Sequence, residues 1–222
     1  MEDIPVDSRT SQPRRVVSLA GEPLNHPPHV CAFFRTTDEE YDLLVPFIRE
    51  GVELGERAFH VVDPAQRANH FGRLEHAGID VATAEHSGQL EVRAWDDAYL
   101  RGGRFSAEAM LALIQEVLDT GLTRGFPLTR LVAHMGWALE ERPGVDELVE
   151  YETRLNYVLP NYNDPVICAY DLARFGSGVV IDILRTHPLA IVGGIVQHNP
   201  FYVPPDQFLR ELRDRPRQPA LT

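Results

Sequence analysis

Continuous runs of apolar residues, bounded by polar or turn-forming positions, recur along this chain and predict buried β-strands. The first run, His29–Phe34, shows no polar alternation, which is typical of a strand that is covered on both faces. The runs are short and rich in β-branched residues, so they favour strands over helices. The other strands are predicted at Ala58–Val62, Leu90–Trp95, Leu131–Leu139 and Val166–Tyr170, with one further apolar run at Leu189–Val196.

Between these runs, apolar residues recur every three or four positions and predict amphipathic helices. The N-cap of the first helix is predicted at Thr37, because Thr37 and Glu40 have the spacing of a capping box, and the helix is predicted to end at Gly51 or Gly55. The remaining helices are predicted at Ala65–His76, from Ser106 through Val117, at Gly144–Leu159, from the Gly176–Gly178 turn to His187, and at Pro204–Asp214.

Strands and helices alternate with short connections, which predicts a doubly wound α/β fold with a mainly parallel sheet and helices on both faces. We expect a single domain over residues 29–214, preceded by a flexible arm over residues 1–28 and followed by a polar tail over residues 215–222. Within the arm, Val16–Leu19 has the pattern of a docked edge strand. Ligands of such folds bind beyond the carboxyl ends of the strands. Here those ends are predicted at residues 35–37, 63, 95–97, 135–137 and 170–171.

The charged residues of the chain exclude several classes of protein. The net charge is −12, so phosphate backbones and anionic membrane surfaces repel the chain, and direct nucleic-acid or membrane binding is not expected. The sequence contains no lysine, and all 21 basic residues are arginine. A P-loop and a pyridoxal-phosphate Schiff base both require a lysine, so both are excluded.

Two cysteines, Cys31 and Cys168, lie in apolar runs and do not form a disulfide framework. The N-terminus has no signal-peptide pattern, and no apolar run is long enough to span a membrane. We therefore expect a soluble, cytoplasmic protein. His29 and Cys31 lie on the same side of a strand, and Cys168 joins them if its strand is the neighbour, which gives a possible metal set. The alternative is that both thiols simply pack in the core.

Several large side chains stand at strand ends or after them, where they can line a pocket for a small, largely apolar ligand. These are Met135, Trp137, Tyr170 and Tyr202, with His187 or His198 as polar anchors. The alternative for each of them is ordinary core packing.

The order of these motifs resembles the MEDS domain family, the sensory domain named for methanogens, methylotrophs and a dichloromethane-responsive regulator. The resemblance covers roughly residues 29–209. It is carried by HVCAFF at residues 29–34, FIREGVELGER at 47–57, MGW at 135–137, VICAYD at 166–171, LRTHP at 184–188 and HNPFY at 198–202.

This resemblance implies a RecA/KaiC-like core without a P-loop, which agrees with the missing lysine. It places the family's histidine and cysteine positions at His29, Cys31 and Cys168, and it places His187 and His198 in the closing motifs. The chain departs from the family pattern before Met135, where the family has an acidic residue and this chain has His134.

The resemblance also implies a stand-alone sensory domain that binds a small, largely apolar organic effector. Such a domain would signal through a partner protein in transcriptional or two-component regulation, and a homo-oligomer is left open. The alternative is an enzyme on the same fold that uses a metal or haem held by the histidine and cysteine set. Metal analysis would distinguish the two.

Overall fold

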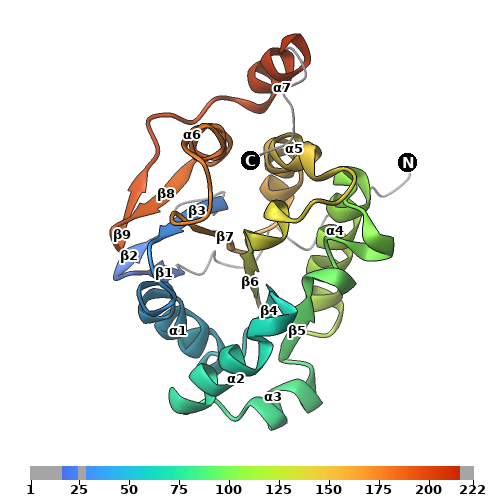
Figure 1. Cartoon of the computed structure of the whole chain (residues 1–222). Helices are drawn as coiled ribbons and strands as arrows, with labels where there is room; N and C mark the ends of the chain where they lie inside the picture. The colour runs from blue at the N-terminus through green and yellow to red at the C-terminus, as the bar shows by residue number, and fades with distance from the viewer. Residues whose placement is uncertain (1–16, 25–28, 216–222) are drawn as a thin grey trace, which may run out of the picture.

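The computed structural model describes residues 17–24 and 29–215, which form a seven-stranded sheet between two layers of helices (Figure 1). The strand order is β5-β4-β6-β7-β3-β8-β9, and all neighbouring pairs are parallel except β8 with β9. The strands are β3 (His29–Phe34), β4 (Arg57–Val62), β5 (Leu90–Ala94), β6 (Thr129–His134), β7 (Val166–Asp171), β8 (Leu189–Val192) and β9 (Ile195–His198). The predicted doubly wound α/β fold is confirmed.

The helices divide between the two faces of the sheet because each buries one apolar stripe. The first face carries α1 (Thr37–Glu53), α2 (Arg67–His76) and α3 (Val81–Ser87), and the second face carries α4 (Ala107–Thr123), α5 (Leu148–Val158) and α6 (Ser177–Thr186). The last helix, α7 (Pro205–Asp214), packs on α5 and α6. Short 3₁₀ turns occupy Pro64–Gln66, Trp95–Asp97, Arg101–Gly103, Met135–Leu139, Val145–Glu147 and Leu159–Asn161.

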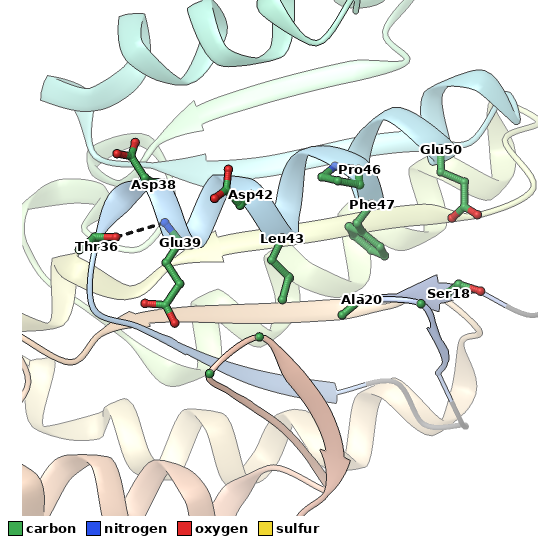
Figure 2. Close-up of a pocket in the computed structure, with 13 residues that line it drawn as sticks. Ser18, Ala20, Thr36, Asp38, Glu39, Asp42, Leu43, Pro46, Phe47 and Glu50 are labelled. Atoms are coloured by element: carbon green, nitrogen blue, oxygen red, sulfur yellow. Dashed lines mark hydrogen bonds between the residues drawn. The ribbon is translucent and has the colours of Figure 1, made fainter.

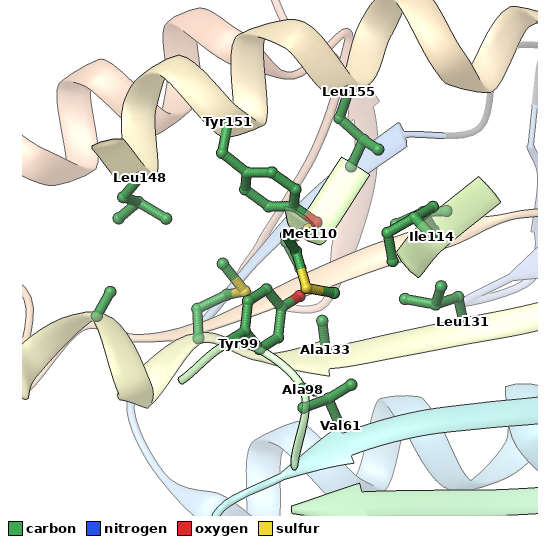
Figure 3. Packing of buried hydrophobic residues seen from close by; sticks show 14 of the residues in the cluster. Val61, Ala98, Tyr99, Met110, Ile114, Leu131, Ala133, Leu148, Tyr151 and Leu155 are labelled. Atoms are coloured by element: carbon green, nitrogen blue, oxygen red, sulfur yellow. The ribbon is translucent and has the colours of Figure 1, made fainter. Parts of the chain in front are cut away.

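The core beneath α4 and α5 includes a group of aromatic rings. Figure 3 shows two of them, Tyr99 and Tyr151, among aliphatic side chains. Trp137 stacks on Tyr99 with ring centroids 4.6 Å apart and on Phe105 with centroids 4.4 Å apart. Tyr151 on α5 meets Phe105 edge-on. Stacked and edge-to-face rings of this kind stabilise a core beyond the apolar area that they bury.

Two positions in the sheet leave room for a ligand at the carboxyl edge. The chain leaves β3 and β4 towards the first face, whereas it leaves the adjacent strands β7 and β6 towards the second face. The connections therefore diverge between β3 and β7 and between β4 and β6. In doubly wound sheets this divergence opens the crevice in which ligands bind.

Two predicted strands need correction. The strand predicted at Leu131–Leu139 ends at His134, and the residues after it form a 3₁₀ turn that carries Trp137 into the core. The run Leu189–Val196 is a hairpin rather than one strand, because Gly193 and Gly194 both take a positive φ and turn the chain.

The start of the first helix and the N-terminal arm also differ from what the sequence predicts. The N-cap of α1 is Thr36 rather than the predicted Thr37: the Thr36 hydroxyl accepts from the Glu39 amide, and Thr37 is the first residue of the helix. Within the arm, residues 17–24 form a small hairpin of β1 (Ser18–Leu19) and β2 (Glu22–Pro23), with Leu19 buried against the first face. Of the predicted edge strand Val16–Leu19, the structure describes residues 17–19, and Ser18–Leu19 pair with β2 of this hairpin. Residues 1–16 and 25–28, and the tail from 216, lie outside the described residues.

Candidate functional site

A cluster of four buried side chains lies between the sheet and the second helical face. His29 comes from β3, Cys168 from β7, Glu152 from the middle of α5, and His187 from the residue that follows α6. One ligand atom from each of them lies within 4.8 Å of all the others. Each of the four side chains is buried. The described residues hold no other group of three or more histidine, cysteine or carboxylate side chains with this spacing.

The secondary structure explains why these four residues meet. Residues of β3 and β7 pair in parallel register, with Cys31 opposite Cys168, so His29 and Cys168 lie diagonally on the same face of the sheet. Glu152 occupies the apolar face of α5, four residues after Leu148 and three before Leu155. A carboxylate on such a face faces the sheet rather than the solvent.

The two imidazoles are held in fixed orientations by hydrogen bonds at Nδ1. His29 Nδ1 lies 3.1 Å from Asn156 Oδ1, and the Asn156 amide nitrogen donates to the carbonyl oxygens of residues 152, 153 and 186. The Asn156 oxygen is therefore an acceptor, and His29 Nδ1 is the donor. His187 Nδ1 lies 2.9 Å from the carbonyl oxygen of Ile183, so it donates as well. With Nδ1 protonated, each neutral imidazole presents an Nε2 lone pair.

Those lone pairs point at Glu152. Its Oε1 accepts the hydroxyl of Tyr170 at 2.7 Å, while its Oε2 lies 3.3 Å from His29 Nε2 and 3.5 Å from His187 Nε2. Burial by itself would raise the pKa of Glu152, but the charge that His187 and His29 carry when they are protonated, with the hydroxyl of Tyr170, lowers it. Burial, followed by the effect of His29, lowers the pKa of His187 to about 3.

The structure brings only part of the predicted site together. His29, Cys168 and His187 belong to the cluster, and Tyr170 is hydrogen-bonded to it. Cys31 is not among the four ligands: its thiol donates to the carbonyl oxygen of Leu189 instead. Glu152 was missed, although a carboxylate at an inward position of an amphipathic helix is a readable signal.

The remaining predicted residues lie apart from one another. Trp137 is fully buried in the aromatic core, and His198 is exposed on the edge strand β9. Tyr202 is partly buried between β9 and α7. Of the predicted pocket residues, Met135 lines the pocket described next, at the carboxyl edge of the sheet. Neither of the two pockets described below is lined by Tyr170, Trp137 or His198.

A pocket of about 260 Å³ does lie at the carboxyl edge, where the connections diverge. We call it the carboxyl-edge pocket. Its lining is mainly polar and comes from the first turns of α1, from the turn after β4, and from the ends of β5, β6 and β7. The lining residues are Thr37, Glu40, Tyr41, Asp63, Gln66, Asn69, Trp95, His134, Met135, Gly136, Ala169, Asp171 and Arg174.

His134 lines this pocket and has one ring nitrogen without a hydrogen-bond partner among the described residues. Its Nδ1 lies 3.6 Å from Glu40 Oε1, and its Nε2 is buried without a hydrogen-bond partner among the described residues. Behind it runs a hydrogen-bonded chain: Tyr41 Oη lies 2.8 Å from His70 Nδ1, and His70 Nε2 lies 2.9 Å from His60 Nδ1. Burial, together with the neighbouring histidine at position 134, lowers the pKa of His60 to about 3.

A second, more open groove of about 810 Å³ runs along the other side of α1 (Figure 2). Leu43, Pro46 and Phe47 of α1 give it an apolar side. Gly193 and Gly194 of the β8–β9 turn also line it. Four carboxylates also line it: Asp38, Glu39, Asp42 and Glu50. Helix α1 therefore contributes to both the groove and the carboxyl-edge pocket.

The sheet order and the pocket at its carboxyl edge define an α/β domain of the RecA/KaiC-like class. Its fold is similar to the crystal structure of the KaiC-like protein PH0186 from Pyrococcus horikoshii OT3, with a TM-score of 0.56 and 16% sequence identity, over 80% of each chain. At that identity the likeness concerns the fold alone.

The chain belongs to the MEDS family, the methanogen/methylotroph, DcmR sensory domain, whose sequence profile matches residues 28–188. It is also similar to the transcriptional repressor DcmR of Methylorubrum extorquens (strain DSM 6343 / CIP 106787 / DM4), with 30% identity over 171 residues. The match covers 76% of this chain and 61% of the repressor, so the chain spans about three fifths of that relative's length.

The resemblance inferred from the motifs is confirmed, and it supports a regulatory sensory role. Among the described residues, no helix has the length and apolar character needed to cross a membrane.

Proposed function

We propose that this domain senses a small organic molecule in the carboxyl-edge pocket and passes its state to a partner protein in transcriptional regulation. Membership of a sensory family and similarity to a repressor support the regulatory part of this proposal. The match to that repressor accounts for 61% of its length. As part of the proposal, the output function is assigned to a partner protein.

The observation that carries the proposal is the buried Nε2 of His134. Buried polar atoms are almost always hydrogen-bonded, and leaving one unpaired costs about 1–3 kcal/mol. His134 Nε2 has no partner among the described residues, and its side chain lines a pocket of about 260 Å³. A bound molecule that hydrogen-bonds this atom would remove that cost.

The pocket also suggests the chemistry of the effector. Glu40 faces His134 Nδ1, which favours the tautomer with the proton on Nδ1 and leaves Nε2 as an acceptor. Asp171 and Arg174 add charged groups to the wall, and Met135 and Trp95 add apolar surface. We therefore expect a small molecule with a hydroxyl or amine donor, more polar than the largely apolar effector expected from the sequence.

Helix α1 offers a route from the pocket to the surface. Thr37, Glu40 and Tyr41 line the carboxyl-edge pocket, while Asp42 and Leu43 on the same helix line the groove of Figure 2. An effector that orders the first turns of α1 would change the shape of the groove. The proposal therefore assigns partner recognition to α1. Hydrogen exchange of the α1 amides, measured with and without effector, can test this assignment.

Ligand-observed NMR with a panel of one- to three-carbon alcohols, amines, aldehydes and halides tests the proposal. At least one hydroxyl or amine compound should bind the wild-type protein, and His134→Ala should weaken that binding by about 1–3 kcal/mol, or roughly 5- to 150-fold. The matched control is His76→Ala, at an exposed position of α2. Equal binding by the wild-type protein and His134→Ala would place the effector elsewhere, as would a panel without a single binder.

The enzyme alternative gains no support from the described residues. The four side chains of the buried cluster are at most 1% exposed, so a substrate in solution cannot contact them.

A further inference from the structure

We infer that His29, Glu152, Cys168 and His187 bind one divalent transition-metal ion of the zinc class in the interior of the domain. This inference concerns a different place in the fold from the effector pocket and does not depend on the proposed function. It also replaces the metal set considered from the sequence, since Cys31 is outside the cluster and Glu152 and His187 are inside it.

The spacing of the ligand atoms fits a tetrahedral site. Metal–ligand bonds of about 2.0–2.3 Å place neighbouring ligand atoms about 3.3–3.6 Å apart in a tetrahedron. Glu152 Oε2 lies 3.3 Å from His29 Nε2 and 3.5 Å from His187 Nε2. The same oxygen lies 3.6 Å from Cys168 Sγ, and that sulfur lies 3.9 Å from His29 Nε2. A small contraction separates these four distances from a bound geometry, and the other ligand-atom pairs, which lie within 4.8 Å, would have to close further.

The cluster has too few protons for its acceptors. Both imidazoles donate from Nδ1 to other partners, so their Nε2 lone pairs face a carboxylate oxygen that is itself an acceptor. The thiol of Cys168 is the one neutral donor left, and its single proton can form a hydrogen bond to only one of these acceptor atoms. His187 Nε2 indeed has no hydrogen-bond partner among the described residues, although the side chain is fully buried. A cation at the centre would satisfy all four atoms together.

The charges also balance when the ion is divalent. A thiolate and a carboxylate contribute two negative charges, and two neutral imidazoles contribute none, so the loaded site is neutral. Neutrality matters because an uncompensated charge in the interior is costly.

The outer partners have the arrangement of a prepared metal site. Ligating histidines usually donate their second ring nitrogen to a carbonyl or carboxylate group, which fixes the ring orientation. Asn156 fills this role for His29, and the Ile183 carbonyl fills it for His187. Tyr170 holds Glu152 Oε1, so Oε2 is the free oxygen for the metal. A set of two nitrogens, one sulfur and one oxygen suits zinc and cobalt, whereas magnesium and calcium require oxygen ligands.

The test uses the full-length chain, unfolded with chelator and refolded with Co²⁺ or Zn²⁺, because buried ligands would exchange metal slowly in the native state. We expect about one ion per chain by elemental analysis. The Co²⁺ form should show a tetrahedral visible spectrum with a thiolate charge-transfer band. Cys168→Ser should remove that band and weaken Co²⁺ binding at least about tenfold, since the loss of an outer partner alone costs about 10- to 100-fold.

Cys31→Ser is the matched control, because Cys31 lies opposite Cys168 on the neighbouring strand, is equally buried and bonds elsewhere. It should keep the band and the stoichiometry. If Cys168→Ser fails to fold, the wild-type spectrum and stoichiometry decide the question. A folded wild-type protein that retains far less than one ion per chain overturns the inference. So does a Co²⁺ spectrum that is unchanged in Cys168→Ser or lost in Cys31→Ser.

Discussion

Tyr170 and Glu152 share a hydrogen bond of 2.7 Å in which both groups are fully buried, and this bond decides which carboxylate oxygen faces the two histidines. Tyr170 lies on β7 and Glu152 on α5, so the bond also ties the helical layer to the centre of the sheet. Burial, followed by the charge of Glu152, raises the pKa of Tyr170, which keeps the phenol protonated and a donor.

Replacing this tyrosine tests the bond directly. Tyr170→Phe should lower the free energy of unfolding by about 1–3 kcal/mol, because it leaves a buried carboxylate oxygen without its donor. Urea unfolding in the presence of a chelator measures the loss without any contribution from bound metal. Tyr157→Phe is the control, since Tyr157 is 47% exposed and its bond to Asp206 lies at the surface. Equal losses of unfolding free energy in the two variants would show that the buried hydrogen bond contributes no more to stability than the exposed one.

The buried histidines predict a loss of stability in acid. The pKa of His60 is lowered to about 3 in the fold, whereas the unfolded chain takes up this proton near pH 6.5. The stabilisation is therefore complete above pH 6.5 and is lost as the pH falls from there towards 3. His60→Gln should flatten the fall in unfolding free energy by about 1.4 kcal/mol per pH unit between pH 6 and 4. Urea unfolding at several pH values measures the slope, and His76→Gln, at an exposed position, should leave it unchanged.

Arg130 holds two carboxylates of very different exposure. Its Nε donates to Glu56 at 2.6 Å and its Nη1 to Glu50 at 2.8 Å, and the Glu56 side chain is fully buried while that of Glu50 is 45% exposed. Glu56→Ala should cost about 3–5 kcal/mol, because it leaves the Arg130 charge buried with less compensation. Glu50→Ala should cost about 1 kcal/mol or less. Thermal and urea unfolding compare them, and similar costs would contradict this account.

Trp137 should contribute to stability rather than to recognition. It stacks on Tyr99 and on Phe105 and has no exposed surface. Trp137→Ala should therefore lower the free energy of unfolding by about 3–5 kcal/mol. Phe201→Ala, at a position that is 63% exposed, should change it by less than about 0.5 kcal/mol. A fully stable Trp137→Ala protein that fails to bind the NMR panel would instead support the sequence-based hypothesis that this ring contacts a ligand.

Most of the sheet could be predicted because buried parallel strands leave a continuous apolar run. His29–Phe34 and Val166–Asp171 were recognisable for this reason, and the structure pairs them at the centre. An apolar run does not reveal its conformation, however. Met135–Leu139 is as apolar as the strand before it, yet it forms a 3₁₀ turn, and this turn removes Trp137 from the predicted pocket.

The candidate sites were harder to predict because their residues come from distant segments. Glu152 alone carried a local signal, as a carboxylate on the inward face of α5. The sequence placed Cys31 and Cys168 equally well as ligands, since both lie on the same side of adjacent strands. Only the position of α5 and of the turn after α6 selects Cys168, and that choice depends on tertiary packing.

The central place of β3 has a consequence for the order in which the protein is made. This strand leaves the ribosome before the other six strands of the sheet, but both of its partners, β7 and β8, come from residues 166–192. Until those residues emerge, neither edge of β3 has a partner in the sheet, and His29 is 139 positions away from Cys168. Folding that depends on such distant contacts is slow. A chain interrupted before residue 166 would therefore expose an unpaired strand with the composition of a core, which is a site for aggregation or for chaperone binding.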